Sequence, residues 1–336
     1  MKRLFSIFIL TLLISPVLFS MGGGDRSGRN DERLNIVSLT FPSYDFVRVI
    51  AGDRVNLSLL TSPGMESHSF EPSPRDIISI RNSNLFIYPG GHGSAWMDRV
   101  LETTLTNDNR PRILGLIDMV DGLEEEFVEG MEVYHGHDDD DDDHDDHDHH
   151  DHHDHHDDDE LELDEHVWTS PRNAILIVSA LTETLAELDP ANAAFFRQNA
   201  AAYITQLREL DAAFQAAVSG ARRSMILVGD RFPFRYLAHH YGLEYYAAFS
   251  GCSTDTEPSA ATVSFLINQV RSNQLPVVFH IELSTERIAD TISEATGARK
   301  LLLHSAQNVS MRDFNAGITY LDIQRANVNN LRTALW

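Results

Sequence analysis

One run, residues 135–160, constrains this chain more than any other stretch, because it contains no apolar side chain. It consists of ten His, fourteen Asp, one Glu and one Gly. A segment of this composition cannot join a hydrophobic core, and it is expected to be disordered. The folded part of the chain must therefore come from the residues on either side of this run, which is called the His/Asp tract below.

The composition of the tract indicates metal binding. Neutral imidazole nitrogen suits borderline divalent cations, and carboxylate oxygen can complete their coordination shells. A solvated charge run that only keeps the protein soluble is the alternative, but solvation needs acid and does not need ten His. The tract is therefore predicted to collect transition metal, above all zinc, weakly and at several sites. An ordered site must be sought elsewhere in the chain.

Net charge and cysteine content exclude two classes of protein. The chain of 336 residues carries a formal charge of −25, of which the fifteen acids of the tract account for most, and the remainder carries only −10. No basic patch is present, so a nucleic-acid partner is disfavoured. Cys252 is the single cysteine, which excludes an intrachain disulfide framework.

The first residues have the pattern of an export signal. Lys2 and Arg3 precede an apolar run, residues 4–18, and small residues follow from Ser20. The run is too short and too quickly broken by glycines for a membrane span, so residues 1–20 are predicted to be a signal peptide and residues 21–33 a flexible linker. Leu18-Phe19-Ser20 also resembles the end of a bacterial lipoprotein signal, with Met21 in place of the lipidated cysteine, so a lipid anchor stays open.

Strand and helix patterns alternate on both sides of the tract. Strands are predicted at residues 34–40, 55–60, 84–88 and 112–117, and again at 225–228, 244–249, 276–281 and 300–303. Helices are predicted at residues 42–51, 73–80, 96–103, 171–188, 234–241, 259–272, 285–296 and 315–335. This alternation predicts the α/β class with mainly parallel sheets.

A long helix between the two sets follows from one apolar stripe. Asp189-Pro190 is a helix start signal, and Gly220 ends the pattern. The stripe consists of Phe196, Tyr203, Leu207, Leu210, Phe214 and Ala217. The predicted architecture is two lobes, each with a mainly parallel sheet flanked by helices. A metal-binding N-terminal lobe (34–189) is joined to a C-terminal lobe (221–336) by a backbone helix (190–220).

Three single histidines lie on loops next to predicted strands or helices. His68 and His304 follow strands, and His166 precedes the helix 171–188. Loops at the carboxyl ends of parallel strands are where open α/β sheets bind ligands, so these side chains could converge. Three imidazoles and an oxygen make a reasonable zinc shell, while unrelated surface histidines are the alternative. His92, His239, His240 and His280 rank lower, and Cys252 is either a thiolate donor or a small buried hydrophobe.

Four segments together resemble the substrate-binding proteins of bacterial zinc and manganese ABC importers. They are Pro63-Gly64-Met65-Glu66-Ser67-His68 with its continuation to residue 74, residues 164–171, residues 189–192 and residues 257–259. The resemblance implies a monomeric, exported protein that is not an enzyme, placed in the periplasm or at the outer face of the cytoplasmic membrane. It would capture Zn²⁺ between two lobes and deliver it to a permease and its ATPase, and its membrane contact would be through the permease.

The resemblance also implies a ligand set. His68 and His166 fall on the first two metal ligands of the family. The third family ligand, a His directly before an Asp, corresponds to Gly229 here, and His304 stands for the fourth. Glu282 and Asp230 are the candidates for an oxygen ligand. A set dominated by imidazole favours zinc over manganese, which prefers more oxygen.

Two other functions stay open at this point. A zinc hydrolase would use a metal-bound water and a carboxylate base, although the chain has no His-Glu-x-x-His helix. Turnover of ester or peptide substrates would identify it. A metal-buffering or adhesive surface protein would lack a permease and an ATPase among its neighbouring genes.

Overall fold

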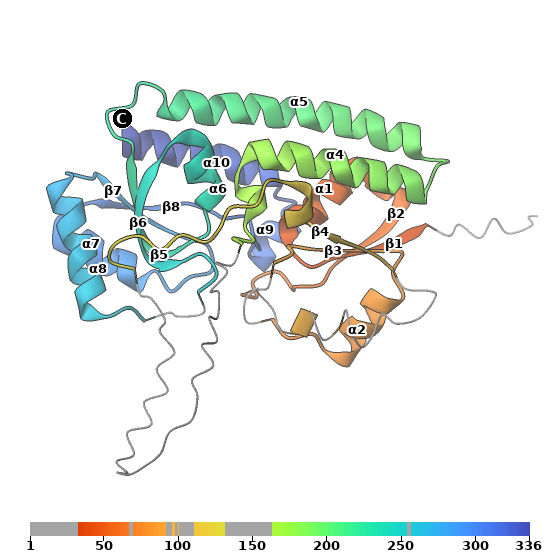
Figure 1. The fold of residues 1–336 in the computed structure, drawn as a ribbon, viewed down its shortest axis with the longest axis horizontal. Coiled ribbons are helices and arrows are strands. Elements are labelled where there is room, and N and C mark those ends of the chain that lie inside the picture. Colours follow the sequence, from red (N-terminus) through yellow and green to blue (C-terminus); the bar gives the residue numbers. More distant parts are fainter. Residues whose placement is uncertain are drawn as a thin grey trace, which may run out of the picture. The chain divides into compact units, whose positions relative to one another are not determined.

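The computed structural model describes residues 33–66, 70–91, 96, 97, 100, 111–131, 163–253 and 257–336. Several predictions lie outside these residues: the signal peptide, nearly all of the linker, the His/Asp tract, most of the helix 96–103, and His68 and His92. The described residues form two parallel sheets with flanking helices (Figure 1). The predicted α/β class is therefore confirmed.

The first sheet has four parallel strands in the order β2-β1-β3-β4. These are β1 (Leu34–Ser38), β2 (Val55–Leu59), β3 (Leu85–Tyr88) and β4 (Arg112–Gly115). Helix α1 (Phe41–Ala51) connects β1 to β2, and α2 (Pro74–Arg81) precedes β3. Because all four strands run in one direction, the loops after them leave the sheet at one edge.

The second sheet repeats this arrangement in the order β6-β5-β7-β8. Its strands are β5 (Met225–Phe232), β6 (Glu244–Ser250), β7 (Val277–His280) and β8 (Arg299–Leu302), and its helices are α6 (Arg235–Tyr241), α7 (Ala260–Ser272) and α8 (Arg287–Thr296). β5 is longer than the predicted strand 225–228, and its pairing with β6 shifts register between Val228 and Arg231. The shift interrupts the regular alternation of β5 side chains between the two faces of the sheet.

Long helices run alongside both sheets (Figure 1). They are α4 (Pro171–Leu188), α5 (Ala193–Val218) and α10 (Tyr320–Leu335). The 26 residues of α5 make a rod of about 39 Å at ~1.5 Å per residue. α5 packs along α4 and α10, and it also contacts α1 and α6. All six members of its predicted apolar stripe are buried, and they belong to a hydrophobic core that includes strand residues of both sheets.

The predicted C-terminal helix 315–335 is wrong in its first turn. The chain forms a short helix, α9 (Met311–Asn315), then breaks, and α10 starts only at Tyr320. Gly317 has a φ of +76°, which a helix does not allow. Thr319 then caps α10 in a capping box with Asp322.

Candidate metal centre

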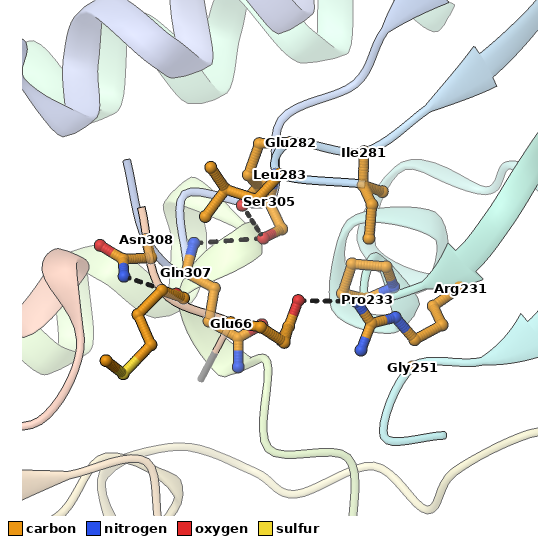
Figure 2. Close-up of a pocket in the computed structure, with 11 residues that line it drawn as sticks. Glu66, Arg231, Pro233, Gly251, Ile281, Glu282, Leu283, Ser305, Gln307 and Asn308 are labelled. Atoms are coloured by element: carbon orange, nitrogen blue, oxygen red, sulfur yellow. Dashed lines mark hydrogen bonds and ion pairs between the residues drawn. The ribbon is translucent and has the colours of Figure 1, made fainter. Parts of the chain in front are cut away.

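A small cavity lies where loops from both sheets meet (Figure 2). Its lining comes from the carboxyl ends of strands: Glu66 lies after β2, Arg231 at the end of β5, Gly251 after β6, Glu282 after β7 and Ser305 after β8. The cavity volume is about 20 Å³. A space of roughly 10–15 Å³ holds one water molecule. The cavity therefore has room for an ion or a water molecule.

His166 is fully buried, and one carboxylate fixes its orientation. Asp164 Oδ1 accepts a hydrogen bond from the His166 backbone N–H at 2.7 Å and lies 3.1 Å from the ring Nδ1. Burial disfavours the charged imidazolium, but the charge and hydrogen bond of Asp164 outweigh it, so the pKa of His166 lies above its ordinary value. A carboxylate on Nδ1 fixes the ring and favours Nε2 as the nitrogen that binds a metal.

Gly251 brings His166 close to the wall of the cavity. A Cβ atom at position 251 would lie 3.3 Å from His166 Nδ1 and 3.1 Å from Asp164 Oδ2. Gly251 also lines the cavity. Because this residue has no side chain, the His166–Asp164 pair can approach the strand end that forms one side of the cavity.

Glu282 presents a carboxylate to the cavity from the opposite loops. It accepts hydrogen bonds from the Ser305 backbone N–H, at 2.7 Å, and from the Ser305 hydroxyl, and its Oε1 lies 3.3 Å from His304 Nδ1. Burial alone would raise the pKa of Glu282, but His304 and the Ser305 donors reverse that and lower it. Glu282 is therefore ionised at neutral pH and available as an oxygen ligand.

His304 is held firmly behind Glu282. The amide of Asn327, on α10, donates to the His304 carbonyl at 2.8 Å and accepts from its backbone N–H at 2.9 Å. His304 Nδ1 also accepts from the Ala306 backbone N–H at 2.9 Å. One ring nitrogen carries at most one proton, so Nδ1 accepts from Ala306 when the proton is on Nε2 and donates to Glu282 when the proton is on Nδ1.

The loops that carry His166 and His304 are joined through Trp168. Its indole N–H donates to the Ser305 carbonyl at 2.9 Å, and its own carbonyl accepts from the Tyr320 hydroxyl at 2.6 Å. Trp168 and Tyr320 are both fully buried. The loop of His166 is therefore tied to the loop of His304 by a hydrogen bond from a buried side chain.

Asp230 does not line the cavity. Its carboxylate accepts from the Arg231 backbone N–H at 2.9 Å and is hydrogen-bonded to Ser284. Burial is the main cause that raises the pKa of Asp230. The structure thus brings Glu282 and His304 together and places His166 behind Gly251, but it sets Asp230 apart.

Arg231 is the residue of this site that the sequence analysis missed. It lines the cavity, and its guanidinium donates to Glu66 at 2.8 Å across it. The resemblance places an imidazole of the family at the position of Gly229. This position faces α8, because a Cβ atom there would come within 2.8 Å of the Ala289 backbone. The space next to the Cα atom of Gly229 is therefore filled by α8 and is not part of the cavity.

The lower-ranked side chains have other roles. His239 is exposed on α6, and His240 lies 2.6 Å from the Ser170 hydroxyl. His280 lies 3.7 Å from Glu286. Burial raises the pKa of the Cys252 thiol well above its usual range, which disfavours a thiolate ligand. Among the residues that the structure describes, no three His, Cys, Asp or Glu side chains form a group that could hold a metal, and His68 is not one of those residues.

The two-sheet fold, with an ion-sized cavity at the strand ends, is that of a substrate-binding protein. Residues 36–334 match the family model ZnuA, described as zinc-uptake complex component A, periplasmic. The chain belongs to this family. The family is one of transport components, not of enzymes, and the predicted resemblance is thereby confirmed. None of the described helices has the length and apolar character that a membrane-spanning helix needs.

Curated relatives and solved structures agree with this assignment. The zinc-binding lipoprotein AdcA of Streptococcus pneumoniae is 33% identical over 304 residues, which are 90% of this chain and 56% of AdcA. The high-affinity zinc uptake system protein ZnuA of Bacillus subtilis is 28% identical over 334 residues, 99% of this chain and 97% of that protein. The Zn(II)-bound ZnuA-like domain of S. pneumoniae AdcA matches with a TM-score of 0.69 at 28% identity, covering 90% of this chain and 99% of that one. This chain therefore spans just over half the length of AdcA.

Proposed function

We propose that this chain captures Zn²⁺ outside the cytoplasm, in the cavity at the strand ends, and delivers it to a membrane permease driven by an ATPase. The observation that carries the proposal is that an ionised Glu282 lines an ion-sized cavity, while a buried His166, oriented by Asp164, lies directly behind Gly251 in the cavity wall. An oriented imidazole and a carboxylate are ligands that zinc prefers. Membership of a zinc-uptake family and the export pattern of residues 1–20 support the same function.

The ligand set is assigned from the side chains that line the cavity or lie directly behind its wall: Glu282 lines it, and His166 lies behind Gly251. We assign His166 and Glu282 as ligands from the described residues, together with the predicted His68. His304 contacts Glu282 at 3.3 Å, so it serves as a further ligand or fixes the Glu282 carboxylate. Of the two predicted oxygen ligands, Glu282 is favoured over Asp230, because only Glu282 lines the cavity.

Deletion of the His/Asp tract, residues 135–160, tests whether the tight zinc site lies in the cavity while the tract binds zinc only weakly. The shortened chain is expected to bind fewer zinc ions but to keep one tight site, because all three assigned ligands lie outside the tract. Metal analysis gives the number of bound ions, and competition titration with a chelator gives the affinity. If the tight site disappears with the tract, the cavity is not the capture site.

Zinc capture should weaken as the pH falls. Zn²⁺ binds the deprotonated imidazole, and the pKa of His166 is raised above its ordinary value, ~6.5. Protons therefore start to compete for His166 at a higher pH than they would for an isolated histidine. The affinity is expected to fall as the pH drops through the raised pKa, in titrations between about pH 8 and 5.5.

In Asp164→Asn the fall should move to lower pH, because the carboxylate that raises the pKa of His166 is gone. An affinity that stays constant over this range contradicts an imidazole ligand.

A further inference from the structure

The cavity contains a fixed positive charge as well as the two carboxylates. Arg231 lines it, and the side chain of Arg231 is only 10% exposed. A guanidinium does not lose its proton in proteins. An entering divalent cation therefore meets a permanent charge of its own sign within a space of about 20 Å³.

Arg231 is held in place from several directions. Its guanidinium donates to Glu66 at 2.8 Å and to the Ser253 carbonyl at 3.4 Å, and its Nε lies 4.0 Å from Asp230 Oδ1. The β5 backbone that carries it is paired with Phe249 of β6. The charge is therefore built into the end of the strand.

The two carboxylates of the cavity differ in their partners (Figure 2). Glu282 accepts hydrogen bonds from Ser305 and lies beside His304, and neither residue carries a permanent charge. Glu66 is paired with the permanent cation Arg231, and its side chain is 33% exposed. A metal ion can approach Glu282 without breaking an ion pair with a fixed charge, but it can take Glu66 only from Arg231.

The lower availability of the Glu66 carboxylate should affect the binding of Mn²⁺ more than the binding of Zn²⁺. Mn²⁺ prefers oxygen ligands and gains from every carboxylate it can reach, whereas Zn²⁺ binds imidazole well and depends less on a second carboxylate. A cavity in which Arg231 retains Glu66 offers Mn²⁺ one oxygen ligand fewer. Repulsion by the guanidinium acts on both ions, because they carry the same charge.

We propose that Arg231 is a specificity-determining residue of the cavity: by pairing with Glu66 it withholds a carboxylate from oxygen-preferring cations and so favours Zn²⁺ over Mn²⁺. This inference rests on the proposed function, because it concerns the same cation site. In this proposal Arg231 lines the ion-binding cavity without being a ligand, and Mn²⁺ is the ion that it disfavours.

The test is a comparison of Zn²⁺ and Mn²⁺ affinities in the full chain, by competition titration of the tight site. Arg231→Gln is expected to bind Mn²⁺ about tenfold more tightly or better, a change of ~1.4 kcal/mol, and to gain less than about threefold for Zn²⁺. In Arg231→Gln/Glu66→Gln the gain for Mn²⁺ should disappear, because the released carboxylate is absent. Arg231→Lys keeps the charge and should keep the selectivity of the unmodified chain.

A matched control is Arg235→Gln. Arg235 lies four positions further along, in α6, and pairs with Glu126 at 3.0 Å outside the cavity, so its replacement should leave both affinities unchanged. An equal gain for both ions in Arg231→Gln, or no gain for Mn²⁺ in a variant with an unchanged melting temperature, overturns the inference. Failure of the proposed function is a separate result: the unmodified chain would then have no tight zinc site.

Discussion

Replacing His166 by alanine is expected to remove tight, stoichiometric zinc binding. Loss of a partner that only orients a metal-binding histidine commonly costs ~10–100-fold in affinity. Removal of the imidazole itself should therefore weaken zinc binding by at least about a hundredfold. Competition titration of the purified chain measures this loss, and zinc uptake by cells in zinc-poor medium measures its consequence for delivery.

His239→Ala is the matched control for this experiment. It also removes one imidazole, but from an exposed position on α6, so tight zinc binding and uptake should both persist. His166 is fully buried, and thermal melting of both variants separates the loss of a ligand from the loss of the fold. A folded His166→Ala chain that still binds one zinc ion tightly would remove His166 from the site.

Elements with strong local signals could be predicted from the sequence with little error. The helix 171–188 was predicted with its observed bounds, because Pro171 opens it and its apolar face is continuous. α2 begins at Pro74, one residue after the predicted start at Ser73, because Ser73 is the N-cap and forms a capping box with Asp76. Such signals depend on neighbours within one turn, which the sequence shows directly.

The cavity could be predicted only in part. The positions of His166, Glu282 and His304 near strand and helix ends were visible in the sequence, because the carboxyl ends of parallel strands point to one edge. The pairing of Glu282 with His304 and Ser305 joins the loops after β7 and β8. No local pattern records which residues of two such loops will meet.

Arg231 could not be predicted, because the strand that carries it is irregular. Alternation along a regular strand assigns side chains to faces by their spacing. The register shift between Val228 and Arg231 interrupts that alternation in residues 228–231, the part of β5 that contains Gly229 and Arg231. A motif aligned to Gly229 therefore pointed to a position that faces α8, while the side chain two residues later reaches the cavity.

The same geometry predicts a large effect for Gly229→His, which would restore the imidazole that the resemblance leads one to expect. The new Cβ would lie 2.8 Å from the Cα and N atoms of Ala289. These are backbone atoms of α8, so relief requires movement of the helix and not of a flexible side chain. Overpacking of this kind typically costs ~1–3 kcal/mol, and occasionally more. We expect a loss of at least about 2 kcal/mol in the free energy of unfolding and no gain in zinc affinity.

Thermal melting and zinc titration of Gly229→His, with Gly122→Ala as the control, test the expected loss of stability and the expected absence of a gain in zinc affinity. A Cβ at position 122 would meet only the side-chain tip of Leu163, at 3.0 Å, which can rotate away. At ~2–4 °C per kcal/mol for a folded unit of this order of size, the His variant should melt at least about 4 °C lower, and the control should change little. A His variant that melts like the unmodified chain and binds zinc more tightly would show that position 229 faces the cavity. The same result would weaken the assignment of Arg231, because both conclusions depend on how β5 turns at its end.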